Sequence, residues 1–169
     1  GAAVGTDTVN MNNTATAGDV YSINNFQMGA AGDTIAIDIS ATGGIADGGG
    51  GAGVVAAGAS VVKAIAAGGT TVAAGDDVFT ISDAIFAGLT QAAAAVIASG
   101  THEITFAGNL AANEEILMAW SDGTDTHISV IINQTSTGTN TAGGTLTDLF
   151  VLVGTDIASM HLDNIDFVT

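Results

Sequence analysis

The stretch ILMAWSDGTDTHISVII, residues 116–132, decides the fold class of this chain. Two apolar runs, 116–120 and 126–132, flank the turn segment Ser121-Asp122-Gly123-Thr124, with Asp125 after it. An Asp-Gly pair between two such runs is a strong signal for a β-hairpin, because glycine adopts the backbone conformation that tight turns need. We therefore expect an antiparallel hairpin here, in a chain that is mainly β.

Further strands are expected on both sides of this hairpin. Residues 33–40 alternate, with Ile35, Ile37 and Ile39 on one face and polar or small residues on the other. The run 146–153 is apolar and continuous, which is typical of a strand buried on both faces. Shorter strand signals lie at residues 19–26, 78–82 and 102–106 and, after a short turn, at the end of 157–168.

One amphipathic helix is expected over residues 83–99. Ser82 or Asp83 can cap its start, and Gly100 can end it. Its apolar stripe consists of Ile85, Phe86, Leu89, Val96 and Ile97. The order of elements is not a regular βαβ alternation, so a doubly wound sheet is not expected. The predicted fold is mainly β, a β-sandwich or a β-roll-like stack of sheets with this helix packed across them.

Glycine-rich segments interrupt the chain, but they do not mark a clear boundary between domains. Residues 41–53 are glycine-rich, and Gly48 to Gly51 are consecutive. We expect a single β-rich domain over residues 1–169, in which this loop is the point where two lobes would separate. Residues 54–81 consist of short Val/Ala runs split by glycines, and they suit either short stacked strands or a helix.

The composition excludes several classes of protein. The chain has 17 acidic residues and one Lys or Arg, Lys63, which gives a net charge of −16. Nucleic acid and anionic lipid surfaces are therefore poor partners, whereas cations are natural ones. The hydrophobic content of 47% is too high for a disordered acidic tail, and no apolar run is long enough to span a bilayer. The absence of cysteine excludes disulfides and thiolate metal sites.

A recurring turn motif carries the chemistry that this sequence offers. Gly5-Thr6-Asp7-Thr8-Val9 and Gly75-Asp76-Asp77-Val78-Phe79 both place an Asp after a glycine and an apolar residue after the Asp. The glycine permits a tight turn, and the carboxylate and turn carbonyls are oxygen ligands suited to calcium. Bound calcium would also reduce the repulsion among the carboxylates. The candidate calcium ligands are Asp7, Asp19, Asp33, Asp38, Asp76, Asp77, Asp122 and Asp125.

These turns resemble degenerate forms of the calcium-binding nonapeptide of RTX proteins, which leave bacteria by type I secretion. Residues 17–40 are similar to the segment that closes an RTX β-roll, and residues 116–168 are similar to the C-terminal region of RTX-type surface proteins, S-layer proteins among them. Tandem Gly-Gly-x-Gly-x-Asp repeats are missing, so the resemblance implies isolated calcium sites on a β scaffold. It also implies a protein that is secreted, extracellular or on the surface of a bacterial cell.

Other site patterns are present only in part. His102, His127 and His161 are far apart in the sequence, so a zinc site would need them to converge in space. Ser129 or Ser159 with a His and an Asp would suit a hydrolase, but no nucleophile-elbow motif accompanies them. Alternating threonines at 135, 137, 139 and 141 suit either a polar loop or a flat row that contacts ice, a glycan or a neighbouring subunit.

The function expected from these features is structural. The first hypothesis is a non-enzymatic secreted protein that assembles with copies of itself into an extracellular surface layer or filament, stabilised by calcium. A cell-surface glycan is a possible further partner, and neither nucleic acid binding nor membrane insertion is expected. The alternative is a C-terminal secretion and folding module of a larger RTX adhesin or enzyme.

Overall fold

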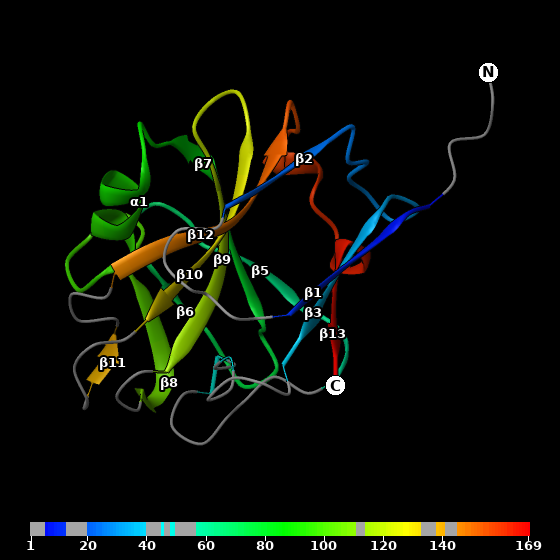
Figure 1. Cartoon of the computed structure of the whole chain (residues 1–169). Helices are drawn as coiled ribbons and strands as arrows, with labels where there is room; N and C mark the ends of the chain where they lie inside the picture. Colours follow the sequence, from blue (N-terminus) through cyan, green and yellow to red (C-terminus); the bar gives the residue numbers. More distant parts are fainter. Residues whose placement is uncertain are drawn as a thin grey trace.

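A computed structural model of the whole chain gives the fold, and it describes residues 6–12, 20–39, 45, 48–49, 57–110, 114–132, 138–140 and 145–169. Within these ranges the protein consists mostly of strands in three sheets, with a single α-helix, as the sequence predicts (Figure 1). The described part of the chain holds no helix of the length and apolar character that a bilayer crossing requires.

The largest sheet has six strands in the order β2-β12-β10-β9-β7-β5. Their bounds are Tyr21–Asn24 (β2), Thr145–Val153 (β12), Thr126–Ile132 (β10), Glu115–Ser121 (β9), Val78–Ile85 (β7) and Val62–Ala64 (β5). The predicted hairpin is confirmed, because β9 and β10 pair antiparallel around the Asp-Gly turn. Gly123 adopts a φ of 96° in this turn, a value that side-chain-bearing residues rarely tolerate.

Two smaller sheets complete the fold. The four-stranded sheet has the order β1-β3-β13-β4, and the three-stranded sheet has the order β11-β8-β6. The bounds of the first are Thr8–Asn12 (β1), Thr34–Asp38 (β3), Ile165–Val168 (β13) and Gly58–Ala59 (β4). Those of the second are Gly138–Asn140 (β11), Ile104–Leu110 (β8) and Thr70–Thr71 (β6). Two short 3-10 helices, Ile157–Ser159 (η1) and Leu162–Asn164 (η2), connect β12 to β13.

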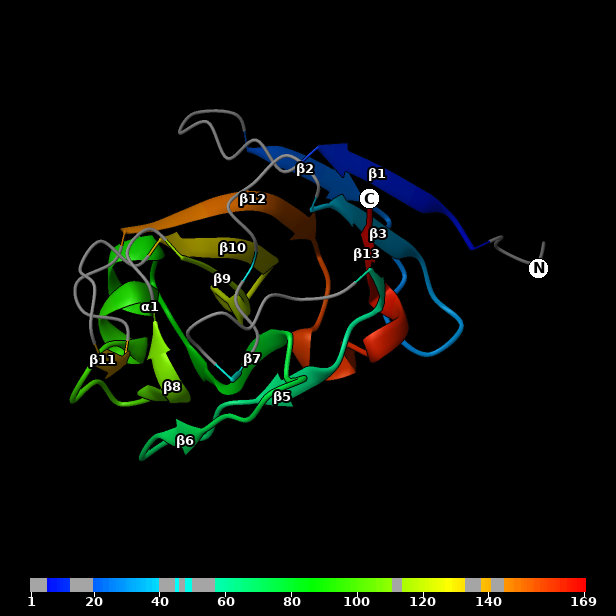
Figure 2. The ribbon, with the colours of Figure 1, turned by 90° about the horizontal axis from the view of Figure 1, so that it is seen from below.

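The six-stranded sheet is buried on both faces, and each face has its own core. On one face Leu117, Ile128 and Phe150 pack against Ile35 and Phe167 of the four-stranded sheet. On the other face the sheet packs against the helix and β8. Figure 2 shows the layers from below, with β12, β10 and β9 between the helix and β8 on one side and β3 and β13 on the other. Stacking of sheets through apolar faces is the sandwich-like arrangement that the alternating strands predict.

The helix is shorter than expected. It covers Leu89–Val96 (α1), whereas the sequence predicts 83–99. Residues 83–85 continue β7 instead, because this strand pairs with β9 as far as Ile85 and Ser121. The cap prediction is also wrong, since Gly88 occupies the N-cap and Ile97 the C-cap. Pairing with a central strand therefore outweighs the helical periodicity of the first turn.

Strands that precede the glycine-rich loop pair with strands that follow it. β2 precedes residues 41–53 and pairs with β12, and β3 precedes them and pairs with β13. Within the loop only residues 45, 48 and 49 are described, and the division into two lobes stays a prediction. The ambiguous stretch 54–81 is described from residue 57 and forms short strands there rather than a helix.

Candidate functional site

The structure brings Asp7 and Asp33 together at the edge of the four-stranded sheet. The carboxylate of Asp33 is buried and accepts hydrogen bonds from the backbone N–H groups of Asp7 (2.8 Å) and Gln27 (2.8 Å). Asp7 itself is exposed. Asp33 therefore joins the loop before β3 to the chain that enters β1. Each oxygen of the Asp33 carboxylate thus already accepts a backbone N–H group, and a cation would compete with these two amides.

Asp122 and Asp125 lie in the β9–β10 turn, and each carboxylate stabilises a loop. Oδ1 of Asp122 accepts hydrogen bonds from the backbone N–H groups of Asp125 and Thr124, both at 2.8 Å. The N–H of Asp125, followed by that of Thr124, holds the pKa of Asp122 below its ordinary value. Oδ1 of Asp125 accepts from the N–H of Gly154 at 2.8 Å, which ties the hairpin to the turn after β12.

Asp76 and Asp77 occupy the turn before β7. Oδ2 of Asp76 accepts from the N–H of Ala73 at 2.9 Å and lies 3.8 Å from Nζ of Lys63. Oδ2 of Asp77 accepts from the N–H of Val61 at 2.9 Å. Both carboxylates thus fix the position of β5 and of the loop before β7.

Two other candidate ligands stand apart from these pairs. Asp38 is half-buried at the end of β3, and Asp19 lies outside the described residues. Among the residues that the structure describes, no three His, Asp or Glu side chains gather as a metal-binding group. Calcium binding therefore stays a prediction, and its best-defined carboxylate pairs are Asp7 with Asp33 and Asp122 with Asp125.

A buried polar network crosses β9, β10 and β12 within the core that faces the helix. Nε1 of Trp120 donates to Oγ of Ser129 at 2.8 Å, and Oγ of Ser129 donates to Oδ1 of Asp148 at 2.5 Å. Oδ2 of Asp148 accepts from Nδ1 of His127 at 2.9 Å. The rings of His127 and Trp120 stack with centroids 4.0 Å apart. One carboxylate thus links three adjacent strands through side chains.

His127 lies between two carboxylates. Its Nε2 is 3.5 Å from Oδ2 of Asp122, beyond good hydrogen-bond geometry, and is otherwise without a partner. Burial alone would lower the pKa of His127, but the hydrogen bond and charge of Asp148, supported by Asp122, outweigh burial and raise it. The folded protein therefore holds a proton on His127 more tightly than a solvent-exposed histidine does.

The order of these contacts differs from that of a hydrolytic triad. In a triad the histidine bonds to the serine and the acid orients the histidine. Here Ser129 and His127 both bond to Asp148, so the imidazole does not accept the serine proton. Ser129 also receives the indole N–H of Trp120 and is fully buried. This group of residues serves as a structural connection between strands.

A second histidine–carboxylate pair lies near the end of α1. His102 is buried, and its Nε2 is 2.9 Å from Oδ1 of Asp83, while its Nδ1 is 3.1 Å from Oγ1 of Thr101. The backbone N–H of Ala67, the largest influence, keeps the pKa of Asp83 below its ordinary value. The three histidines do not converge, so the zinc hypothesis has no support among them: His102 contacts Asp83, His127 contacts Asp148, and His161 contacts Asp163.

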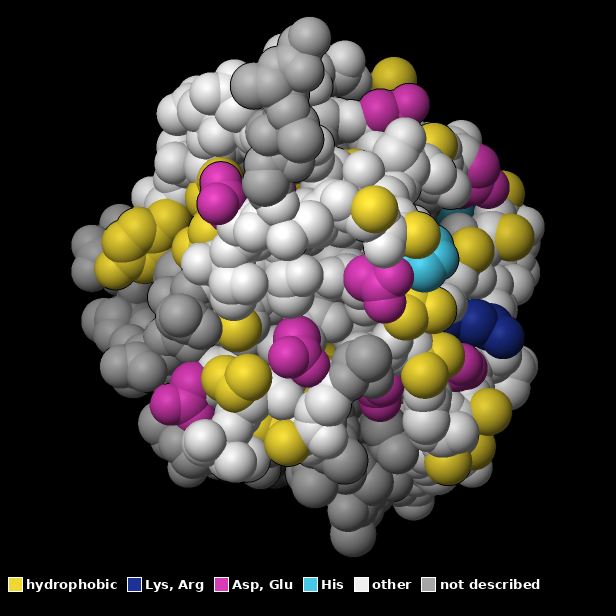
Figure 3. All heavy atoms as spheres, turned by 90° about the vertical axis from the view of Figure 1, so that its right-hand side faces the viewer, with side chains coloured by type: hydrophobic (Ala, Val, Ile, Leu, Met, Phe, Trp, Pro, Cys, Tyr) yellow, Lys and Arg dark blue, Asp and Glu magenta, His cyan; other side chains and the backbone are white. Residues whose placement is uncertain are grey.

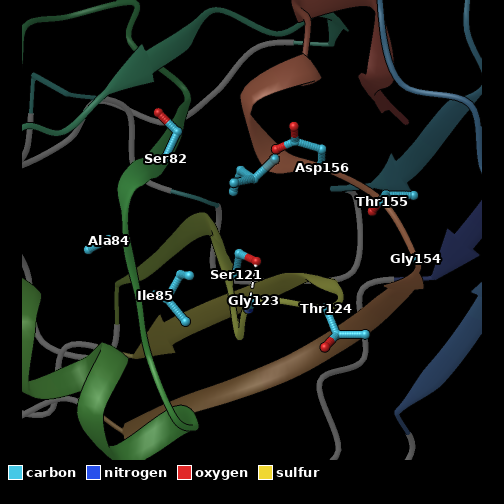
Figure 4. Close-up of a pocket in the computed structure, with 10 residues that line it drawn as sticks. Ser82, Ala84, Ile85, Ser121, Gly123, Thr124, Gly154, Thr155 and Asp156 are labelled. Atoms are coloured by element: carbon cyan, nitrogen blue, oxygen red, sulfur yellow. Dashed lines mark hydrogen bonds between the residues drawn. The ribbon is translucent and has the colours of Figure 1, made fainter.

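A cleft of about 310 Å³ lies where β7, the β9–β10 turn and η1 meet (Figure 4). Ile85 and Ser121 line it from the strands, and Asp156 lines it from the other side. The carboxylate of Asp156 accepts from the N–H of Ala158 and so caps η1.

Of the threonine row, Thr139 lies in β11, whereas residues 135, 137 and 141 lie outside the described residues.

The sequence does not reveal the role of Asp148. It is the single acid in the apolar run 146–153, and that isolation is the one signal that sets it apart.

No protein-family model matches this chain, and searches of the curated proteins and of the solved structures find no significant match.

Proposed function

We propose that this protein is a secreted, non-enzymatic structural unit that assembles with copies of itself into an extracellular filament or surface layer on a bacterium, with calcium bound among its carboxylates. One observation carries the proposal. Apolar residues are exposed at both outer strands of the six-stranded sheet: Tyr21 (53%) in β2 with Val20 (48%) just before it, and Val61 (48%) just before β5. Open strands with exposed apolar residues are templates for pairing with another chain.

Calcium has a physical role in this proposal. Each copy carries a net charge of −16, so copies repel one another at low ionic strength. Divalent cations that bind carboxylates of one or two copies reduce that repulsion. The resemblance of the aspartate turns to RTX calcium repeats supports the choice of calcium, and it supports a bacterial surface as the location. A cell-surface glycan is part of the same proposal, as a further partner.

The experiment that tests the proposal measures assembly against calcium. The purified chain is followed by light scattering and negative-stain electron microscopy in millimolar CaCl₂, in MgCl₂ at the same ionic strength, and in EDTA. We expect ordered assemblies in calcium that dissociate in EDTA. A monodisperse monomer in calcium would contradict assembly, and assemblies that withstand EDTA would contradict the role of calcium.

The alternative function, a secretion and folding module of a larger RTX adhesin or enzyme, rests on the same resemblance. The intact mass of the native secreted protein separates the two. A species near 16.4 kDa favours the structural unit, and a much larger species favours the module.

A further inference from the structure

One continuous row of paired residues runs across the whole six-stranded sheet. Tyr21 pairs with Phe150, Phe150 with Ile128, and Ile128 with Ala119. Ala119 pairs in turn with Thr80, and Thr80 with Ala64. Tyr21 and Ala64 are both exposed. The row therefore begins and ends at exposed residues on opposite edges of the sheet.

The two edge strands also run in the same direction. β2 is parallel to β12, and β12 and β9 are both antiparallel to β10. β9 is parallel to β7, and β7 is parallel to β5. A second copy that is shifted along the row therefore presents its β2 parallel to the β5 of the first copy, with Tyr21 at the level of Ala64.

The backbone of β5 has groups directed to the open side. The carbonyl of Val61 accepts from Asp77 and Val78, and the N–H of Ile65 donates to Thr80 at 2.8 Å, so these odd-numbered residues face β7. In an extended strand, alternate residues direct their N–H and C=O groups to opposite sides. Val62 and Ala64 therefore direct theirs away from the sheet, where an added strand would pair.

A groove beside β5 lies on the face where the Tyr21 side chain would arrive. Tyr21 is two residues from Ile23, which packs against the core shared with the four-stranded sheet, so both side chains lie on that face. The groove has a volume of about 370 Å³ and is lined by Val62 and Ala64 of β5 and by Met160 and Leu162 near η2. Leu162 is 42% exposed, so the groove has an apolar wall open to a partner.

The charge of this edge also suits a second copy. Lys63, in β5, is the only Lys or Arg of the chain, and its side chain is 40% exposed. On the face shown in Figure 3 it is the dark blue side chain, among hydrophobic and acidic neighbours. Lys63 places a positive side chain, 3.8 Å from Asp76, at the β5 edge of a chain that carries 17 acidic residues, so this edge repels an approaching copy less than the rest of the acidic surface does.

We propose that copies of this protein join edge to edge, with β2 of one copy added parallel to β5 of the next and the Tyr21 ring seated in the groove beside Ala64. This inference rests on the proposed self-assembly and specifies the surfaces that carry it. Because unlike edges meet, each copy leaves one edge free for the next, and the product is an open filament rather than a closed dimer. Six strands at a spacing of about 4.8 Å give an advance of about 29 Å per copy.

Disulfide trapping tests this contact directly, because the chain has no cysteine of its own. Tyr21→Cys and Ala64→Cys are made as separate proteins and mixed in calcium at a concentration well over tenfold above that at which the native protein assembles, because Tyr21→Cys lacks the ring. The mixture is then oxidised. Neighbouring strands lie at a spacing that falls within the range a disulfide spans. We expect the mixed dimer of the two variants to dominate over either homodimer. The matched control is Ala94→Cys, an exposed alanine on α1, which should not join Tyr21→Cys above the collision level.

A pair of substitutions at Tyr21 tests the groove. Tyr21→Ala should raise the concentration needed for assembly at least tenfold, and Tyr21→Phe should restore it close to the native value, since the ring and not the hydroxyl fills the groove. Suppose that the native protein assembles but Tyr21→Cys does not form a disulfide with Ala64→Cys, or forms one equally well with Ala94→Cys. Either result would overturn this inference and leave the proposed function standing. Native protein that does not assemble in calcium would overturn both.

Discussion

Nδ1 of His127 lies 2.9 Å from Oδ2 of Asp148 and joins β10 to β12 in the core next to the helix. Because the carboxylates of Asp148 and Asp122 raise the pKa of His127, folding is coupled to protonation of this ring. A raised pKa in the folded state stabilises the protein fully below the ordinary value of about 6.5. That stabilisation is lost as the pH rises from there through the raised pKa.

The first prediction concerns this pH dependence. The free energy of unfolding, measured with urea at pH values from 5.5 to 9, should fall for the native protein above a pH of about 6.5. In His127→Gln that fall should be smaller, and the difference between the two curves isolates this ring from His102 and His161. Curves that stay parallel over the whole range would show that His127 does not gain protons on folding. The pKa of Asp122 is lowered in the folded state, so its contribution to the free energy of unfolding changes only as the pH falls below its ordinary value of 3.8.

The second prediction concerns the buried acceptor. Asp148→Ala removes the partner of both Ser129 and His127, and buried donors without acceptors are costly, so we expect a loss of about 3 kcal/mol in unfolding free energy. Asp148→Asn keeps one acceptor oxygen and should lose less. The control is Asp156→Ala, which removes an exposed cap of η1 and should cost about 1 kcal/mol. Equal losses for the two alanine variants would contradict the structural role given to Asp148.

The third prediction concerns Asn164, which is 1% exposed and joins η2 to the loop before β3. Its Nδ2 donates to the carbonyls of Asp33 (2.9 Å) and Gly29 (3.2 Å), and its Oδ1 accepts from the N–H of Gly29 at 3.0 Å. Asn164→Ala should lower the unfolding free energy by about 3 kcal/mol, because several buried backbone groups lose their partner. Asn24→Ala, at an exposed position of β2, should leave it within about 0.5 kcal/mol. A thermal or urea denaturation series on both variants measures the difference.

The fold class follows from local patterns, whereas the contacts between distant segments do not. The hairpin and the strand at residues 34–38 are predicted well, because turn chemistry and alternation act over a few residues. Ala36 is nonetheless buried together with its isoleucine neighbours, which the alternation of the sequence does not predict. The start of the helix is misplaced because pairing of β7 with β9 is not visible in the local sequence.

The roles of the aspartates illustrate the same limit. The sequence identifies the turns at Asp33, Asp77 and Asp122, and the structure adds that each carboxylate accepts backbone N–H groups. Those partners lie up to 26 residues away, so spacing within a motif cannot reveal them. Asp148 belongs to the same category, because its importance arises only when three strands pair.

The fourth prediction separates calcium binding from general screening of charge. Thermal unfolding at low ionic strength in EDTA should occur at a lower temperature than in millimolar CaCl₂, since a ligand that binds only the folded state at 100 times its dissociation constant adds about 2.7 kcal/mol. MgCl₂ at the same ionic strength screens charge equally but fits oxygen-rich calcium sites poorly. A transition temperature that is the same in EDTA and in calcium, or the same in calcium and in magnesium, would contradict a specific calcium site.

The fifth prediction concerns the turn after α1, where two neighbouring residues should respond in opposite directions. A Cβ on Gly100 would lie 2.2 Å from the carbonyl oxygen of Ala95, so Gly100→Ala forces the backbone apart and should cost about 1–3 kcal/mol. Ser99 has a φ of 65°, which favours glycine, so Ser99→Gly should be neutral or stabilise the protein by up to about 1 kcal/mol. Both variants keep the N–H of residue 99 that donates to Glu103 at 2.9 Å. Urea unfolding of the pair distinguishes a steric requirement at 100 from a conformational one at 99, and a loss at Ser99→Gly as large as that at Gly100→Ala would contradict this geometry.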